Sequence, residues 1–188
     1  DLNKMPADQR VIEIKGDMRN TALLEEHLPG CDAVIHLACI SNDPSFELDP
    51  GLGKSINYDC FPDLVRISKH NGVKRFVFAS SSSVYGEREA VPFSELDPVD
   101  RPISPYAATK RAAELLCHSS HHLFGLGVVV LRLFTAYGPR QRPDLAIHKF
   151  ARLLREGRPL PVYGDGSSAR DYTDVGHILD GVGAALDL

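Results

Sequence analysis

Tyr106 and Lys110 stand four residues apart, and of the six tyrosines only Tyr106 has a lysine at this spacing. In a helix, residues four apart lie on one face, so the phenol and the ammonium would lie side by side. A tyrosine has a pKa of about 10 and is a poor base at neutral pH, but a neighbouring cation lowers that pKa. The pair could then take a proton from a substrate hydroxyl. The alternative is an exposed tyrosine and lysine that merely share a helix face, because such spacings also occur by chance.

The segments around this pair predict how it is positioned. Ser104 and Pro105 are typical of a helix start, with a serine cap and a proline in the first turn, and we expect that helix to run to about His122. A proline-rich acidic loop precedes it. Four serines at 80–83 follow the apolar run 75–79. These serines form either part of a site or a plain polar turn.

Apolar runs and helical segments alternate along the chain, which predicts an α/β fold with a Rossmann-like, doubly wound parallel sheet. In such sheets ligands bind at the carboxyl ends of the strands, so the residues directly after each strand are the first candidates for a site. Pro62 lies within a predicted helix and either kinks it or marks its true first turn. The predicted strands are 11–14, 33–38, 75–79, 128–134 and 161–163, the predicted helices are 21–27, 56–70, 104–122, 144–157 and 178–186, and 41–53 is predicted to be a loop.

The composition excludes several classes of protein. The 188 residues are 43% hydrophobic and 24% charged with a net charge of −4, so a globular domain is expected and nucleic acid is not an expected partner. No apolar run approaches the roughly 20 residues that span a bilayer, so no membrane partner is expected. The four cysteines lack a CxxC spacing and no secretory signal is present, which predicts reduced thiols in a cytoplasmic protein. Cys117 and His121 are spaced as helical neighbours, but no further ligand lies nearby in sequence, so no metal site is expected.

Four motifs occur in order, namely Phe78–Gly86, Ser104–Lys110, Leu131–Pro139 and Arg170–Val175. Together they resemble the NAD-dependent epimerase/dehydratase family, the extended short-chain dehydrogenases. The stretch 104–175 is most similar to UDP-glucuronate and UDP-glucose 4-epimerases. The resemblance implies that the cofactor is NAD, that the substrate is a nucleotide sugar of the UDP type, and that the enzyme inverts the sugar by transient oxidation at C4.

The resemblance also implies roles by position. Tyr106 would act as the base, while Lys110 would keep it acidic and hold the nicotinamide ribose. Ser81 would bond the reacting hydroxyl, with Ser80 or Ser82 in its place if the alignment shifts by one. Further cofactor contacts are implied for Asp17 at the adenine and for Asn57 at the start of the helix beneath the cofactor. The other implied cofactor contacts are Leu37, Ala38, Cys39, Ala79 and Phe134. Contacts with the substrate are implied for Ser82, Ser83, Thr135, Tyr137, Arg142 and Arg170.

Arg170 is similar to the arginine that grips the substrate diphosphate, because guanidinium donors bond phosphate oxygens in pairs. The alternative is an ordinary surface ion pair with Asp171 or Asp174. Arg142 is a second candidate for the same task. Gly176 and His177 stand where the family usually has one or two acids.

The glycine-rich phosphate-binding turn of the family is not present, because the glycines at 51 and 53 follow no strand. We therefore expect a truncated chain that lacks the first β-α-β unit. Residues 1–140 would form a partial NAD-binding domain with the catalytic residues. Residues 141–188 would begin a substrate-binding region interleaved with it. The resemblance further implies a homodimer, joined by the helices that begin near 56 and 104.

Three alternatives to an epimerase stay open. A 4,6-dehydratase shares the first oxidation step but needs an Asp-Glu pair directly after Ser81, where this chain has Ser82 and Ser83. A reductase would use the same tyrosine, lysine and serine. The chain could also be a non-catalytic fragment of a dinucleotide-binding fold.

Overall fold

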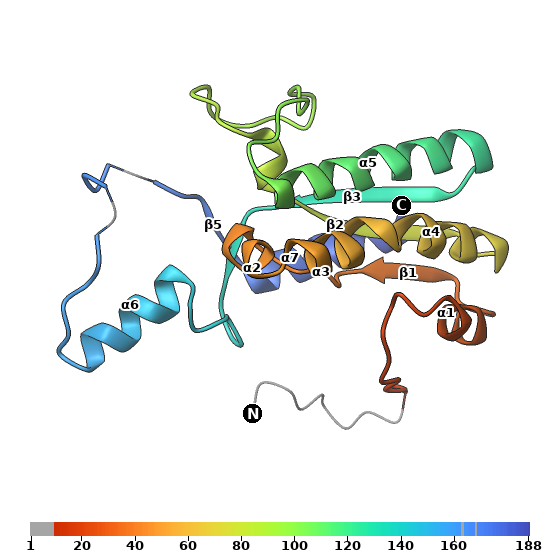
Figure 1. Cartoon of the computed structure of the whole chain (residues 1–188), viewed down its shortest axis with the longest axis horizontal. Coiled ribbons are helices and arrows are strands. Elements are labelled where there is room, and N and C mark those ends of the chain that lie inside the picture. Colours follow the sequence, from red (N-terminus) through yellow and green to blue (C-terminus); the bar gives the residue numbers. More distant parts are fainter. Residues whose placement is uncertain (1–9, 163, 168) are drawn as a thin grey trace. The chain divides into compact units, whose positions relative to one another are not determined.

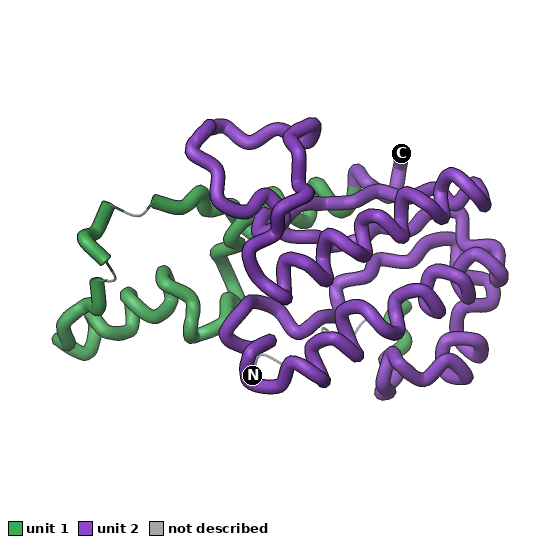
Figure 2. The backbone as a smooth tube through the Cα atoms, turned by 45° about the horizontal axis from the view of Figure 1, so that its top comes forward, with its two compact units in different colours: residues 1–12, 134–183 green, residues 13–133, 184–188 purple. Residues whose placement is uncertain are grey.

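The computed structural model describes residues 10–162, 164–167 and 169–188. The chain divides into two compact units (Figure 2). The larger unit consists of residues 13–133 and 184–188, and the smaller unit of residues 134–183 with the described residues 10–12. The expected functional division at residue 140, between cofactor binding and substrate binding, stays a prediction.

The larger unit is built on a parallel sheet of β1 (Ala33–His36), β2 (Arg75–Ser81) and β3 (Gly127–Leu133), in that order (Figure 1). β-Branched and aromatic residues fill β2 and β3, as expected of strands in a covered parallel sheet. The register places every second residue of the three strands on a common face. These features confirm the predicted α/β class with a Rossmann-like parallel sheet.

Three helices pack around one face of this sheet, namely α1 (Thr21–His27), α4 (Phe61–His70) and α5 (Pro105–Phe124). Burial of each large apolar side chain between them contributes roughly 1.5–3 kcal/mol to stability. This packing fixes the ends of the strands, where the candidate site lies. The core side chains are those of Phe61, Leu64, Val65, Val73, Phe76, Phe78, Ala113, Cys117 and Leu126.

The start of α5 follows from its sequence. The Ser104 hydroxyl accepts a hydrogen bond of 3.1 Å from the Ala107 amide, and Pro105 occupies the first turn. Gly125 ends the helix in the left-handed conformation, with φ of 65°, which glycine adopts without steric penalty. The predicted helix is therefore confirmed, and it ends at Phe124 instead of near His122.

Pro62 lies in the first turn of α4, so it marks the start of that helix and does not kink it. A π-helical turn of five residues, η1 (Ser55–Asp59), precedes α4 in the chain. The predicted single helix over 56–70 is therefore two elements. Turns of the π type are frequent at functional sites, and this one carries Asn57.

The prediction of a loop over 41–53 is wrong. Two short helices occupy it, α2 (Asp43–Leu48) and α3 (Pro50–Lys54). The side chains of Asn42 and Asp49 cap them by accepting hydrogen bonds from backbone amides, and each helix has a proline in its first turn. Residues that end regular structure in one context start a helix in another, which is why their composition was misleading.

The prediction of a strand over 11–14 is also wrong, because these residues carry no ladder to any described strand. Val11, Ile12 and Ile14 are exposed. A β-branched, alternating segment becomes a strand only when a neighbouring backbone pairs with it. The predicted strand at 161–163 is absent at residues 161 and 162, and Tyr163 lies outside the described residues.

The smaller unit contains β4 (Thr135–Tyr137), which pairs in parallel with β5 (Tyr172–Asp174), and the amphipathic helix α6 (Ala146–Arg155). The last helix, α7 (Val175–Asp187), begins in this unit and ends in the larger one. Both predicted helices in this part of the chain are confirmed, with boundaries shifted by a few residues. None of the helices within the described ranges combines the length and apolarity needed to cross a bilayer.

Candidate active site

The carboxyl ends of β1, β2 and β3 meet at one edge of the sheet, because the three strands are parallel. The segment 37–40 follows β1 at this edge. The 3-10 turn η2 (Ser82–Tyr85) follows β2. In the larger unit, most of the residues predicted from the sequence to belong to the site lie on these segments or at the start of α5.

Tyr106 is the second residue of α5 and Lys110 follows one turn later. Their exposed fractions are 7% and 4%, so both side chains belong to the buried face of the helix. The alternative of an exposed pair on a solvated face therefore does not hold. Lysine is almost never buried to this extent without partners, so its contacts are informative.

Lys110 is anchored at the end of β2. Its Nζ donates a hydrogen bond of 2.7 Å to the carbonyl oxygen of Ala79 and lies 5.0 Å from the centroid of the Phe78 ring. The ammonium also interacts with the side chain of Cys39, which follows β1. One cation thus connects α5, β2 and the segment after β1.

Burial sets the electrostatics of this centre. Desolvation lowers the pKa of Lys110, although the interaction with Cys39 opposes the shift. His36 stacks on Phe78 with ring centroids 5.8 Å apart, and burial, followed by repulsion from Lys110, lowers its pKa to about 4. His36 is therefore neutral at physiological pH, which leaves Lys110 as the cation beside Phe78.

Ser81 is half-buried at the end of β2, and its hydroxyl caps η2. The Ser81 Oγ accepts from the Ser83 amide at 3.2 Å and lies 3.1 Å from the Ser83 Oγ. Ser80 is buried and donates to a carboxylate on α5. Of these neighbouring serines, Ser80 is thus committed to the interior, which favours Ser81 over Ser80 for the predicted contact with a substrate hydroxyl.

Asn57 is buried in η1 and clamps the segment after β1. Its Oδ1 accepts from the Ile40 amide at 2.8 Å, while its Nδ2 donates to the Ile40 carbonyl at 3.0 Å. Both backbone groups of Ile40 are therefore satisfied by one side chain. The exposed residues 37 and 38 just before it present backbone and side chain at the sheet edge, where a cofactor contact is predicted.

Asp17 is exposed and forms an ion pair with Arg19, whose guanidinium also donates to the Ser55 hydroxyl at 3.2 Å. Hydrogen bonds from Arg19 lower the pKa of Asp17 to about 2. The carboxylate is therefore ionised and able to accept a further hydrogen bond. This state is the one that the predicted adenine contact requires.

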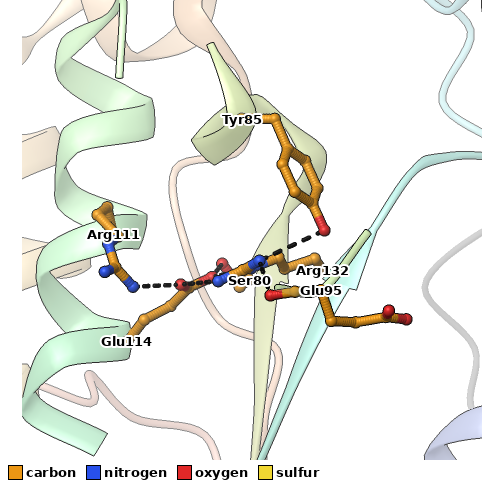
Figure 3. Close-up of polar contacts among 6 residues, drawn as sticks. All are labelled: Ser80, Tyr85, Glu95, Arg111, Glu114 and Arg132. Atoms are coloured by element: carbon orange, nitrogen blue, oxygen red, sulfur yellow. Dashed lines mark hydrogen bonds and ion pairs between the residues drawn. The ribbon is translucent and has the colours of Figure 1, made fainter. Parts of the chain in front are cut away.

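The sequence analysis missed a group of polar residues centred on Glu114 and Arg132 (Figure 3). Glu114 is buried on α5, and its carboxylate bonds Arg132 of β3 and Arg111 of α5. Two signals were available. Glu114 follows Lys110 by one helical turn, and Arg132 is the one charged residue in the apolar run Gly127–Leu133.

The remaining predicted residues lie in the smaller unit. Thr135 and Tyr137 belong to β4, where they pair with residues of β5. Arg142 forms an ion pair with Asp144. Arg170 is exposed and donates to the carbonyl of its neighbour at 169. The implied contacts of these residues, and of Phe134, with substrate and cofactor stay predictions.

Cys117 and His121 have separate structural tasks. Cys117 is fully buried in the core, and burial raises the pKa of its thiol to about 12. His121 Nδ1 lies 2.9 Å from the Leu126 carbonyl oxygen. Within the described residues, no group of three His, Cys, Asp or Glu side chains is arranged to hold a metal ion.

The sequence model of the NAD dependent epimerase/dehydratase family matches residues 3–188. The UDP-glucuronate 4-epimerase of Thermodesulfobacterium geofontis is 43% identical over 154 residues, which are 82% of this chain and 47% of that protein. The UDP-glucuronate 4-epimerase 5 of Arabidopsis thaliana is 39% identical over 183 residues, 94% of this chain and 42% of that protein. The chain thus spans about half the length of these curated relatives.

Solved structures of similar enzymes also superpose on this chain. The UDP-glucuronic acid 4-epimerase from Bacillus cereus, in complex with UDP-glucuronic acid and NAD, superposes with a TM-score of 0.88 at 38% identity, covering 97% of this chain and 57% of that one. DesIV, a dTDP-glucose 4,6-dehydratase from Streptomyces venezuelae, superposes with a TM-score of 0.89 at 32% identity, covering 96% of this chain and 56% of that one.

Proposed function

The chain belongs to the NAD-dependent epimerase/dehydratase family, and on this premise we propose that the protein is a UDP-sugar 4-epimerase that works by transient oxidation at C4. The observation that carries the proposal is the buried Lys110 ammonium, held against the Ala79 carbonyl one helical turn after Tyr106. A fixed cation at this place favours ionisation of a nearby phenol.

The residues at the sheet edge fit NAD as the cofactor. Ionised Asp17 offers an acceptor for the adenine amino group, and the segment 37–39, held in place by Asn57, offers exposed backbone along a dinucleotide. Lys110 offers a donor for the nicotinamide ribose. Bound at these residues, NAD would supply a reversible acceptor for the hydride of the sugar carbon. Ala79 and Phe134 complete the proposed cofactor contacts.

The protein's own groups handle the proton. In the proposed reaction, Tyr106 takes the proton from the C4 hydroxyl and later returns it to the C4 oxygen on the opposite face of the sugar. Ser81 donates a hydrogen bond to that oxygen, as alcohol and then as carbonyl, and its position at the end of β2 is fixed by its bond to the Ser83 amide. Lys110 keeps the phenol of Tyr106 acidic.

The substrate that we propose is a UDP-hexuronate or UDP-hexose, and UDP-glucuronate is the substrate named for the epimerases of Thermodesulfobacterium geofontis and Bacillus cereus. Arg170 is exposed and Arg142 is half-buried, and their guanidinium groups suit a diphosphate. The hydroxyls of Ser82, Ser83, Thr135 and Tyr137 are proposed to contact the sugar.

Dehydration of the sugar is the competing reaction, because DesIV superposes as well as the epimerase does, with TM-scores of 0.89 and 0.88, although its sequence identity is lower, at 32% against 38%. The residues favour epimerisation. A dehydratase needs an acid to protonate the leaving hydroxyl and a base to remove the neighbouring proton. Here the two positions after Ser81 are Ser82 and Ser83, which are poor at both tasks.

We further propose that the protein is a cytoplasmic homodimer. All four cysteines are free thiols, which fits a reducing compartment. The surface between α2, α3, η1 and the start of α5 forms an apolar groove, lined by residues such as Phe46, Tyr58 and Ala108. A second copy could cover this groove with the same helices. Light scattering of the full-length protein tests the dimer.

The proposal is tested with full-length protein, catalytic NAD and a panel of UDP-sugars. Proton NMR of the product should show inversion at C4, with an equilibrium mixture of the two epimers. A product that has lost water and carries a 4-keto-6-deoxy sugar would instead identify a dehydratase. Net consumption of a nicotinamide cofactor would identify a reductase, since an epimerase regenerates its NAD in each cycle.

A further inference from the structure

Glu114 is a buried carboxylate for which the proposed reaction has no task. It lies on α5, one turn after Lys110 and two turns after Tyr106, with an exposed fraction of 5%. A carboxylate is rarely buried in this way unless its oxygens are fully hydrogen-bonded. The partners of Glu114 therefore show what its burial achieves.

Three donors from two strands and a helix converge on Glu114 (Figure 3). The Ser80 Oγ donates to Oε1 at 2.6 Å, and Arg132 donates to both oxygens, with Nε at 3.1 Å and Nη2 at 3.0 Å. Arg111 adds a bond of 3.0 Å to Oε2. Ser80 and Arg132 are register partners on β2 and β3, so one carboxylate locks the ends of both strands to α5.

Arg132 extends this group of residues to the next two segments of the chain. Its Nη1 donates to the Tyr85 hydroxyl at 3.3 Å and to the Glu95 carbonyl at 3.1 Å, and its guanidinium lies 5.1 Å from the centroid of the Tyr85 ring. All three guanidinium nitrogens are thus engaged. These contacts tie the end of η2 at Tyr85, and the loop at Glu95, to the Glu114–Arg132 pair, while Ser80 ties the strand just before the turn to Glu114.

We propose that Glu114 and Arg132 are positioning residues, which hold Ser81 and the turn that follows it in register with the α5 face that carries Tyr106. The proposal rests on the function proposed above. We call Glu114 and Arg132 together the hub. Ser80, directly before Ser81, and Tyr85, at the end of the turn, both form hydrogen bonds with the hub. Ser81 therefore lies between two residues that the hub holds in place.

The chemistry of the hub explains why a rigid arrangement results. The Glu114–Arg132 contact is a bidentate pair of charged groups, which fixes direction as well as distance. A buried polar network with every member satisfied specifies one geometry. In catalysis, a misplacement of about 1 Å can reduce turnover by about 100-fold, so the hub is expected to affect the rate more than substrate affinity.

The experiment compares three variants of the full-length protein with wild type. Glu114→Gln keeps the shape of the side chain but directs an amide toward the arginines, and Arg132→Lys keeps the charge but cannot span four contacts. Arg111→Gln is the matched control, since it removes an arginine from the same carboxylate without touching the turn or the loop. For each variant, kcat, KM, the thermal midpoint and hydrogen exchange of the 81–85 amides are measured.

The expected result is a fall in kcat of about 10- to 100-fold for Glu114→Gln and Arg132→Lys, with KM changed by less than about threefold and faster exchange at 81–85. Arg111→Gln should stay within about twofold of wild type. The proposal is overturned if the two variants keep the kcat of wild type. It is also overturned if their loss of turnover merely follows the fraction of unfolded protein.

Hydrogen exchange separates this proposal from the proposed function. If wild type shows no epimerase activity but the two variants exchange faster at 81–85, the proposed function fails and the control of the turn by the hub stands. If wild type is an active epimerase and exchange at 81–85 is unchanged in the variants, the hub is not a positioning device and the proposed function stands.

Discussion

The Nζ of Lys110 donates a hydrogen bond of 2.7 Å to the carbonyl oxygen of Ala79, so a helix and the carboxyl end of a strand share one buried cation. Burial lowers the pKa of this lysine, while the Phe78 ring and Cys39 lie against it. The charge is therefore held in place and poorly screened by solvent. Such a charge can act on a phenol one helical turn away.

Replacement of Lys110 by methionine tests this role. Methionine keeps the apolar stem against Phe78 but removes the ammonium, so we expect kcat to fall by about 100-fold or more. The rise of activity with pH should move to higher pH, because the phenol loses the cation that favours its ionised form. Lys69→Met, at an exposed site in the last turn of α4, is the control and should behave as wild type. An unchanged pH profile in Lys110→Met would contradict the proposed electrostatic role.

Tyr106→Phe removes only the hydroxyl that is proposed to carry the proton. We expect kcat to fall by about 100- to 10,000-fold, with binding of the UDP-sugar changed by less than about threefold in calorimetry. Tyr58→Phe in η1 removes a hydroxyl that has no task in the proposed reaction, keeps the aromatic ring in the groove proposed for the dimer, and provides the matched control. Full activity of Tyr106→Phe would rule out this tyrosine as the base.

Asn57 is expected to control the segment after β1. In Asn57→Leu, the amide and carbonyl of Ile40 lose both partners, which should lower the free energy of unfolding by about 2–4 kcal/mol. Asn57→Asp keeps the acceptor for the Ile40 amide but loses the donor, so it should lie between Asn57→Leu and wild type. Chemical denaturation measures the stability, and hydrogen exchange reports on the Ile40 amide. If that amide exchanges equally slowly in all three proteins, the claim that Asn57 holds the backbone of Ile40 in place is wrong.

His36 predicts a dependence of stability on pH. The pKa of its imidazole is about 4 in the folded chain against an ordinary value of 6.5, so between these values the unfolded state binds a proton that the folded state does not. Stability contributed by neutral His36 is therefore present above about pH 6.5 and is lost as pH falls toward 4, by roughly 3 kcal/mol in total. Urea denaturation across this range measures the slope.

His36→Phe supplies the comparison for that measurement. Phenylalanine can keep the stacking on Phe78 and the tilted ring contact with Phe61 but cannot bind a proton. The part of the pH slope due to residue 36 should therefore disappear. An identical slope in both proteins would show that other groups cause the acid sensitivity.

Much of the larger unit could be predicted because its signals are local. The serine and proline at 104 and 105 start α5, and the apolar runs predicted as strands at 75–79 and 128–134 form β2 and β3 within two residues of those bounds. The parallel sheet then places the ends of the strands at one edge without any further information. This reasoning led from the sequence to Tyr106, Lys110 and the serines after β2.

The features that escaped prediction depend on pairs that are distant in the sequence. Glu114 forms hydrogen bonds with Ser80, 34 residues away in the sequence, and with Arg132, 18 residues away. Asn57 forms hydrogen bonds with Ile40, 17 residues away. The spacing of Glu114 after Lys110 and the lone charge of Arg132 in its strand mark these residues, but neither signal identifies the partner. The prediction of a strand over 11–14 failed for the opposite reason, because the local strand pattern is present but no strand among the described residues pairs with it.

The most direct test of transient oxidation at C4 follows a deuterium label. A UDP-sugar that carries deuterium at C4 is incubated in ordinary water with full-length protein and catalytic NAD, and the epimeric product is isolated and examined by mass spectrometry and NMR. We predict that the product keeps the deuterium at C4, because the hydride leaves and returns within one active site while Tyr106 moves only the hydroxyl proton. Exchange of the C4 label for solvent hydrogen, or inversion with loss of the C4 oxygen, would contradict the proposed mechanism.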